Sequence, residues 1–340
     1  MALEDGGIWF PAVRVGTGVD TFTECLVDGL TRRGIRAEIE WLPPRAEFLP
    51  WSVKVPRPPD WASVVHINSW IHKRFIPKKL PCLVTLHSCV HDPAFEPYKS
   101  RIQSIYHRFW VYRREIESMQ RAQNITAVSD YTARVAMAMF PEAGEIRTLH
   151  NWVDTSIFAP VKRSCADTPF RLLFVGNVSV RKGRDLLVQI MASLGPDYEL
   201  SYTGVPEDFP NGSSLPENMI SLGRITGAES MARFYQSHDA LLFPSRLEGL
   251  PLSVLEASSS GLPVIASDAS SLPEVVRHNK TGILCEAENV EAYVNAVKLL
   301  ANTPAIWLEM RKNAREWIES EFSMEPALDR YIETYHAMLR

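Results

Sequence analysis

The sequence predicts an α/β protein made of two Rossmann-like domains. Short apolar segments that resemble strands alternate with segments of helical periodicity, which is typical of parallel sheets covered by helices on both faces. The chain has 340 residues, which exceeds one average domain. A polar stretch at 161–168, followed by Pro169, divides it near the middle. We therefore expect one domain over 1–160, a second over 161–322, and a closing helix over 323–340.

Each expected strand is a short apolar run, and each expected helix has apolar residues three or four positions apart. In the first domain the strands are 8–10, 35–42, 63–68, 82–88 and 124–129, and the helices are 19–33 and 99–123. In the second domain the strands are 171–177, 198–205, 219–225, 240–245 and 262–268, and the helices are 184–194, 228–237, 251–260, 289–302 and 304–321. Ligands of open α/β sheets bind beside the carboxyl ends of strands, so functional residues are expected there, in a deep cleft between the domains.

Composition indicates a cytoplasmic protein, or one that contacts a membrane only from its inner face. Hydrophobic residues make up 46% and charged residues 22%, as in ordinary globular proteins. No apolar run approaches the roughly 20 residues of a membrane span, and the N-terminus does not resemble a signal peptide. The cysteines are scattered singly, which favours reduced thiols; they are Cys25, Cys82, Cys89, Cys165 and Cys285.

The net charge of −4 is unevenly distributed. Residues 71–121 contain 10 Lys and Arg against 4 Asp and Glu, interleaved with aromatic residues. Such a segment attracts anions, such as phospholipid headgroups, phosphorylated acceptors or nucleic acid. A solvated helix face is an equally good interpretation of the charge pattern by itself.

Residues 244–268 predict a binding site for a sugar diphosphate. Pro251 suits the first turn of a helix, so Glu248 should lie in the loop before that helix and Glu256 within it. A helix that begins after a Gly/Pro loop presents unpaired N–H groups and a positive dipole end to phosphate. The two carboxylates would accept hydrogen bonds from sugar hydroxyls.

A second phosphate-binding segment is predicted at 174–187. Here a strand ends near Gly176 and a helix begins near Gly183, with Lys182 between Arg181 and Arg184. These cations would neutralise a diphosphate in place of a metal ion. A plain surface turn is the simpler interpretation of this segment alone, but the 244–268 segment favours the phosphate site.

Two features of the first domain give weaker signals. Gly16 and Gly18 lie between a strand and a helix, but without a third glycine and a downstream acid they do not form a dinucleotide fingerprint. Their backbone would instead approach a ligand closely. His87 follows a strand, where structural histidines are common, and His87 with His91 lacks the partners of a metal site. Ser129 is expected to cap a helix.

Together these segments resemble the family 4 (group 1) retaining glycosyltransferases of the GT-B fold, from the GTG loop to the C-terminus. TAVSDYTA and LHNWVDTSIF resemble segments before the interdomain linker, and FVGNVSVRKG resembles the lysine loop. SLGRITGAESMARFYQSHDALLFPS resembles the nucleoside segment. EGLPLSVLEASSSGLPVIAS resembles the donor-binding motif most specifically, and FSMEPALDRYIETYHAML resembles the helix that crosses back to the first domain.

The resemblance implies that the donor is a nucleotide sugar and that transfer proceeds with retention, without metal or cofactor. The leaving diphosphate would help to activate the acceptor hydroxyl. The implied catalytic residues are His87 beside the sugar, Lys182 on the diphosphate and Glu248 on the sugar. The implied donor-binding residues also include Gly16 and Gly18 near the leaving phosphate, Arg181, the backbones of Arg224 and Ile225 at the base, the N–H groups of Gly249 and Leu250, and Glu256 on the ribose.

The chain departs from the family pattern at three places. Asn177 occupies the position where the family usually has an arginine that binds the diphosphate, so Arg181 or Arg184 would have to supply that positive charge. Trp152 replaces a glycine, and Ser270-Ser271 replace a glycine-rich pair near the donor, which bears on the choice of donor sugar.

The resemblance also suggests partners and localisation. The nucleotide is expected to be UDP, with GDP second, and the acceptor a glycan or lipid-linked hydroxyl in cell-surface polysaccharide or lipopolysaccharide synthesis. The basic segment, with Arg108, Trp110, Arg113 and Arg114, would then rest on an anionic membrane. The alternatives are an inactive glycan- or nucleotide-binding protein and a nicotinamide-dependent oxidoreductase. Nucleic acid is not an expected partner, because the net charge is negative and no known motif is present.

Overall fold

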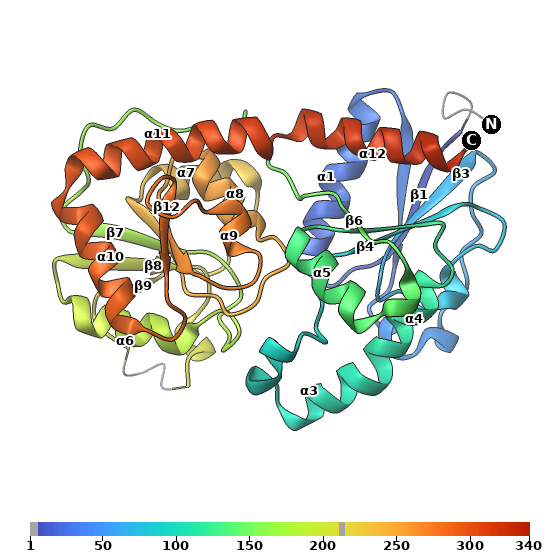
Figure 1. Cartoon of the computed structure of the whole chain (residues 1–340), viewed down its shortest axis with the longest axis horizontal. Coiled ribbons are helices and arrows are strands. Elements are labelled where there is room, and N and C mark those ends of the chain that lie inside the picture. The colour runs from blue at the N-terminus through green and yellow to red at the C-terminus, as the bar shows by residue number, and fades with distance from the viewer. Residues whose placement is uncertain (1–5, 211–214) are drawn as a thin grey trace. The chain divides into compact units, whose positions relative to one another are not determined.

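The computed structural model describes residues 6–210 and 215–340, which form two compact units (Figure 1). Unit 1 consists of Met1–Asn151 and Met324–Arg340, and unit 2 consists of Trp152–Ser323. Each unit contains a six-stranded sheet whose paired strands are parallel. The predicted class, α/β with two Rossmann-like domains, is confirmed.

The sheet of unit 1 has the strand order β2-β1-β3-β4-β5-β6. Its strands are β1 (Gly7–Val13), β2 (Arg36–Leu42), β3 (Ala62–Asn68), β4 (Cys82–Leu86), β5 (Asn124–Ala127) and β6 (Arg147–Thr148). Its helices are α1 (Gly18–Arg32), α2 (Arg45–Phe48), α3 (Arg101–Tyr106), α4 (Tyr112–Met119), α5 (Asp130–Met139) and α12 (Met324–Met338). Shorter turns are η2 (Pro50–Ser52), η3 (Lys73–Phe75), η4 (Pro93–Tyr98), η5 (His107–Val111) and η6 (Pro141–Ala143).

The sheet of unit 2 has the strand order β12-β11-β10-β7-β8-β9. Its strands are β7 (Phe170–Phe174), β8 (Tyr198–Tyr202), β9 (Met219–Ser221), β10 (Ala240–Phe243), β11 (Val264–Ser267) and β12 (Gly282–Cys285). Its helices are α6 (Arg184–Leu194), α7 (Ala228–Gln236), α8 (Leu252–Ser259), α9 (Leu272–Val275), α10 (Val290–Asn302) and α11 (Pro304–Glu321), and η7 covers Pro206–Asp208. The two central strands, β7 and β10, are adjacent, which places the loops after them side by side.

The segment expected to be one basic helix, 99–123, is interrupted. It begins as α3, where Ser100 and Gln103 form a capping box, and passes through the π-helical turn η5 into α4. A π-turn inserts one extra residue per turn and so rotates the side chains that follow it. The basic and aromatic residues of this segment consequently do not share one face.

The C-terminal helix α12 belongs to unit 1. Leu328 packs on Gly29 of α1, where an added Cβ would come within 2.8 Å of the leucine methyl groups. The hydroxyl of Tyr335 lies 2.7 Å from Nδ1 of His66, and both side chains are buried. Burial lowers the pKa of His66 to about 3, so this contact joins two neutral groups.

Residues 152–160 belong to unit 2, although the expected domain boundary lay after residue 160. The N–H of Val153 donates to the carbonyl of Phe322 (3.0 Å). Ser259 of α8 likewise donates to the carbonyl of Phe158 (2.6 Å). The aromatic rings of Trp152 and Phe158 are buried, so hydrophobic burial fixes this segment before the polar linker is reached.

Candidate functional site

The loop after β7 carries the cations predicted to bind a diphosphate. Gly183 ends this loop with a left-handed backbone (φ 75°) and caps α6. A Cβ at this position would lie 2.1 Å from the carbonyl oxygen of Pro244, so the backbones of the loops after β7 and β10 touch here. This close approach holds Lys182, which is 9% exposed, against the loop that follows β10.

Replacing Gly183 by alanine should destabilise the protein strongly, because the new methyl group meets both an unfavourable φ and the Pro244 backbone. Gly34, which follows α1, is the control. Its φ is 77°, and an added Cβ there meets no described atom within 4 Å. We expect Gly183→Ala to cost about 2 kcal/mol more unfolding free energy than Gly34→Ala in urea denaturation. Equal losses would mean that the Pro244 contact relaxes freely.

Glu248 lies in the loop after β10 and pairs with the cations of the neighbouring loop. Its Oε1 is 2.7 Å from Nζ of Lys182 and 3.2 Å from a guanidinium nitrogen of Arg181, and it accepts a hydrogen bond from Ser245. Burial alone would raise the pKa of Glu248, but the charges of Lys182 and Arg181 outweigh it and lower that pKa. The ligand-free site thus holds a carboxylate, 7% exposed, between two cations.

Arg246 positions this loop, and sequence reasoning did not identify it. Its guanidinium makes two hydrogen bonds to Asp185 of α6 (both 2.8 Å) and two to Glu288 (both 2.6 Å). The N–H of Arg246 also donates to the carbonyl of Arg181 (2.9 Å). Bidentate pairs of this kind fix orientation as well as distance. The sequence did contain a hint of this pair, because Arg246 lies two residues before Glu248 and Asp185 lies three residues after Lys182.

The serines that replace a glycine-rich pair contact the backbone of Glu248. Ser270 accepts a hydrogen bond from the N–H of Glu248 (3.0 Å), and Ser271 donates to its carbonyl (3.3 Å). Ser270 adopts a positive φ of 51°, which is uncommon for a residue other than glycine. Ser270 and Ser271 therefore both support the loop that carries Glu248.

Glu256 lies within α8, and Pro251 is the N-cap of that helix. The hydroxyl of Tyr235 donates to Oε2 of Glu256 (2.8 Å). Burial raises the pKa of Glu256 to about 7, although the tyrosine hydrogen bond opposes the shift. Glu256 as a residue is partly buried, so its carboxyl group lies in a largely enclosed environment within the helix that follows Glu248.

The remaining donor-binding candidates of unit 2 lie in loops at the same edge of the sheet. Gly249 and Leu250 follow Glu248 directly and precede α8. Arg224 and Ile225 follow β9, after a turn in which Gly223 has a φ of 64°. The side chain of Arg224 is exposed. Because β8 separates β9 from β7, strand order places Arg224 further along the sheet edge than Lys182.

The candidates of unit 1 also follow strands. Gly16, with φ 70°, lies in the loop after β1, and Gly18 is the first residue of α1. His87 follows β4, and its Nε2 is 2.8 Å from Oδ1 of Asn68. Burial lowers the pKa of His87 to about 3, so the ring is neutral. Since an amide oxygen only accepts, Nε2 carries the proton and Nδ1 is left as an acceptor.

The four residues predicted to form a membrane or acceptor patch separate into two pairs. Arg108 and Arg113 are exposed. Arg114 is buried, with its guanidinium 4.3 Å from the ring of Trp110. Trp110 is partly buried and donates its indole N–H to the carbonyl of Glu47 (3.1 Å). Trp110 and Arg114 therefore stabilise unit 1 from within.

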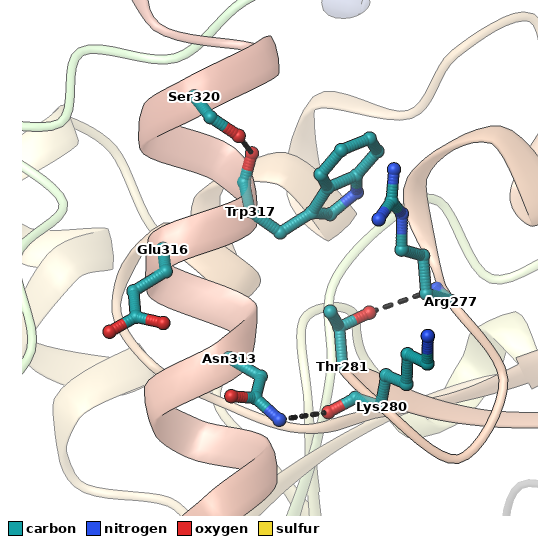
Figure 2. Close-up of a pocket in the computed structure, with 7 residues that line it drawn as sticks. All are labelled: Arg277, Lys280, Thr281, Asn313, Glu316, Trp317 and Ser320. Atoms are coloured by element: carbon teal, nitrogen blue, oxygen red, sulfur yellow. Dashed lines mark hydrogen bonds between the residues drawn. The ribbon is translucent and has the colours of Figure 1, made fainter.

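Unit 2 also contains a pocket of about 330 Å³ between α11 and the loop at 277–281 (Figure 2). Figure 2 shows Trp317 beside Arg277, whose guanidinium carbon lies 3.3 Å from the centre of the indole. Asn313 closes the opposite side by donating to the carbonyl of Lys280 (3.3 Å). The predicted donor-binding residues do not line this pocket, and its contacts join α11 to the loop that precedes β12.

Comparison with known proteins identifies the family. The model of glycosyl transferases group 1 matches residues 159–317, and that of glycosyltransferase family 4 matches residues 31–157. An uncharacterized glycosyltransferase of Haemophilus influenzae is 32% identical over 167 residues, which are 47% of this chain and 47% of that protein. The chain spans about half the length of the curated relatives that it matches.

Solved structures resemble the whole chain. Sucrose-phosphate synthase from Thermosynechococcus elongatus has a TM-score of 0.78 at 18% identity, covering 98% of this chain and 99% of that one. HepE of Anabaena, solved in complex with UDP and glucose, has a TM-score of 0.70 at 13% identity, covering 98% and 100%. At such identities the likeness concerns the fold, which is GT-B. With one family model matching each of its two successive parts, the chain belongs to the group 1, family 4 glycosyltransferases.

Proposed function

We propose that the protein is a retaining glycosyltransferase that moves a sugar from a UDP-sugar to a hydroxyl of a glycan or lipid-linked acceptor, without a metal ion. The observation that carries this proposal is the cluster of Lys182, Arg181 and Glu248, which two adjacent strands bring together at the carboxyl edge of the sheet. A cation pair suits a diphosphate, and a carboxylate suits sugar hydroxyls.

In the proposed reaction, the bond between the anomeric carbon and the diphosphate oxygen breaks, and the acceptor oxygen bonds to the same face of the sugar. The leaving diphosphate takes the acceptor proton. Lys182 and Arg181 would stabilise the charge that develops on the diphosphate, which is the role a metal ion has in other transferases. Glu248 would orient the sugar, and no side chain is required as a nucleophile.

UDP is proposed as the nucleotide because the fold neighbour HepE was solved with UDP and glucose. The acceptor is proposed to be a glycan or lipid-linked glycan of the cell surface, such as lipopolysaccharide. An anionic membrane surface on the cytoplasmic side is the proposed place of reaction, because cations exceed acids in residues 71–121 of unit 1.

The test is a nucleotide screen followed by a turnover assay. UDP is expected to raise the melting temperature more than GDP, ADP or NAD, and UDP-sugars should be hydrolysed or transferred with EDTA present. A product of unchanged anomeric configuration by NMR would support retention. Nucleotide binding without turnover of UDP- or GDP-sugars, with acceptors supplied, would instead favour an inactive binding protein, as Asn177 suggests from the sequence.

Donor affinity should depend on pH through Glu256. Burial raises the pKa of Glu256 to about 7, so the carboxylate that accepts ribose hydroxyls prevails above this pH and is lost below it. We expect UDP-glucose, whose diphosphate does not titrate in this range, to bind more weakly as the pH falls from 8 to 6. Glu256→Gln should bind about tenfold more weakly at pH 8 and lose this dependence, because hydrogen bonds to a charged group are the stronger ones. In calorimetry, the exposed control Glu309→Gln on α11 should behave as wild type, and equal wild-type affinity at both pH values would exclude this role.

A further inference from the structure

A group of large apolar side chains is exposed on two segments of unit 1. We call it the apolar patch and define it as Phe48 (55% exposed), Leu49 (63%), Trp51 (73%), Ile102 (80%), Ile105 (60%) and Phe109 (69%). Monomeric soluble proteins seldom expose contiguous apolar surface, and where they do it usually marks an interaction site.

Direct contacts hold the two segments of the patch together. The hydroxyl of Tyr106 donates to the carboxylate of Glu47 (2.8 Å). The rings of Phe48 and Tyr106 lie 5.8 Å apart. The indole of Trp110 donates to the carbonyl of Glu47 (3.1 Å), as described above. These contacts hold the two segments next to each other, although more than fifty residues of sequence separate Phe48 from Tyr106.

Helix α3 contributes to this surface, and its largest apolar side chains face solvent. All residues of α3 are described, and none of them is fully buried. Ile102 and Ile105 lie three positions apart in α3, which places them on one face of that helix, and Phe109 follows in the π-helical turn η5. A short helix in water derives most of its stability from packing an apolar face, so α3 is expected to pack against something outside unit 1. In Figure 1, α3 lies away from the sheet of its unit.

Positive charges surround the patch. Arg101 of α3 and Arg108 of η5 are exposed, and the guanidinium of Arg74 lies 4.8 Å from the ring centre of Trp51. Arg113 of α4 is also exposed and pairs with Glu117 (3.1 Å), which pairs with Lys73 as well (3.0 Å), while Glu47 accepts a hydrogen bond from Tyr106.

A groove of about 670 Å³ is lined by residues that flank the segment of Phe48, Leu49 and Trp51 in sequence, among them Arg45 and Val53. Three exposed cations, Arg45, Lys54 and Arg57, line it, together with Glu40. Apolar side chains framed by cations match the interface of a bilayer that contains anionic lipid, where apolar groups enter the acyl boundary and cations meet phosphate.

We propose that the apolar patch docks unit 1 onto an anionic bilayer, with its six side chains inserted and the surrounding cations on lipid phosphates. This proposal rests on the proposed function, because a lipid-linked acceptor is the reason for the enzyme to dock. It adds to that function the surface that would bring the enzyme to the acceptor. Trp110 and Arg114 support the patch from beneath, while Arg108 and Arg113 belong to its rim.

Sedimentation with vesicles tests the docking. Wild-type protein is expected to pellet with vesicles of phosphatidylglycerol and phosphatidylcholine, and at least tenfold less with phosphatidylcholine alone. Ile102→Ser with Ile105→Ser should reduce binding to the anionic vesicles at least tenfold. The matched control is Leu299→Ser with Leu308→Ser, which removes two exposed leucines (41% and 38%) from unit 2 and should bind as wild type.

Three outcomes would overturn the proposal: absence of binding to the anionic vesicles, wild-type binding by the Ile102/Ile105 variant, and equal loss in the leucine control. Light scattering supplies a fourth, because a wild-type dimer that becomes monomeric in the Ile102/Ile105 variant would assign the patch to a second copy. UDP-induced thermal shifts, measured on the same samples, separate this proposal from the enzymatic one. A retained UDP shift without vesicle binding overturns only the docking, and vesicle binding without a UDP shift overturns only the UDP-sugar activity.

Discussion

Replacement of Lys182 by alanine is expected to lower kcat/KM for sugar transfer by about 10²- to 10³-fold, the usual cost of removing one preorganised group that stabilises developing charge. Lys182 is almost fully enclosed, and its Nζ lies 2.7 Å from Glu248. Without it, Arg181 alone would face the leaving diphosphate. The measurement is steady-state release of UDP from the UDP-sugar identified by the screen, with and without acceptor.

The control for this prediction is Lys312→Ala. Lys312 lies on α11 with its side chain 73% exposed and 3.6 Å from Glu316, so its removal should leave kcat/KM unchanged. Circular dichroism and the urea midpoint should show that Lys182→Ala remains folded. A folded Lys182→Ala enzyme with wild-type kcat/KM would remove Lys182 from the mechanism.

Replacement of Glu248 by glutamine is expected to separate nucleotide binding from transfer. In the ligand-free site, Glu248 neutralises Lys182 and Arg181, so a bound diphosphate must compete with it for these cations. Removing the negative charge should tighten UDP binding by about threefold to tenfold, since even screened charges a few ångströms apart interact by about 1 kcal/mol or more. Transfer should nevertheless fall about 10²-fold, because the amide orients the sugar less well than the carboxylate.

Calorimetry with UDP and turnover of the UDP-sugar measure the two effects separately. Glu291→Gln, at an exposed position in the first turn of α10, serves as the control and should change neither. If Glu248→Gln bound UDP more weakly while transfer was unchanged, Glu248 would be a nucleotide ligand and not a sugar ligand.

The sequence predicted the two parallel sheets and much of the order of their strands and helices, because periodicity is a local property. Helix α5 was missed, although its cap, Ser129, was recognised: Ser129 accepts a hydrogen bond from the N–H of Thr132, as a capping residue does. Strand β12 was also missed, because four residues are too few to establish an apolar period. The predicted helix at 99–123 was only partly right, since a π-turn does not alter the apolar spacing enough to be read from the sequence.

The candidate site was predictable to the extent that its residues follow strands. Glu248 was selected from the residue types around it, Lys182 was selected with the support of the Glu248 segment, and strand order makes the two neighbours. Arg246 was not selected, because its meaning depends on two carboxylates that are distant in sequence, Asp185 and Glu288. A charged residue that acts through such partners cannot be distinguished, by local pattern alone, from a solvated one.

What the sequence determined by itself was the family and the two-sheet architecture, together with the residue types of the candidate site, because these reside in local motifs. Only the tertiary structure decided that β7 lies beside β10, so that Lys182 meets Glu248, and that a π-turn sends Arg114 inward while Ile105 and Phe109 remain exposed. The physical reason is that pairing across a sheet and the rotation of a helix depend on contacts between distant segments. The free energy of such contacts is a property of the whole fold and of no single stretch of the chain.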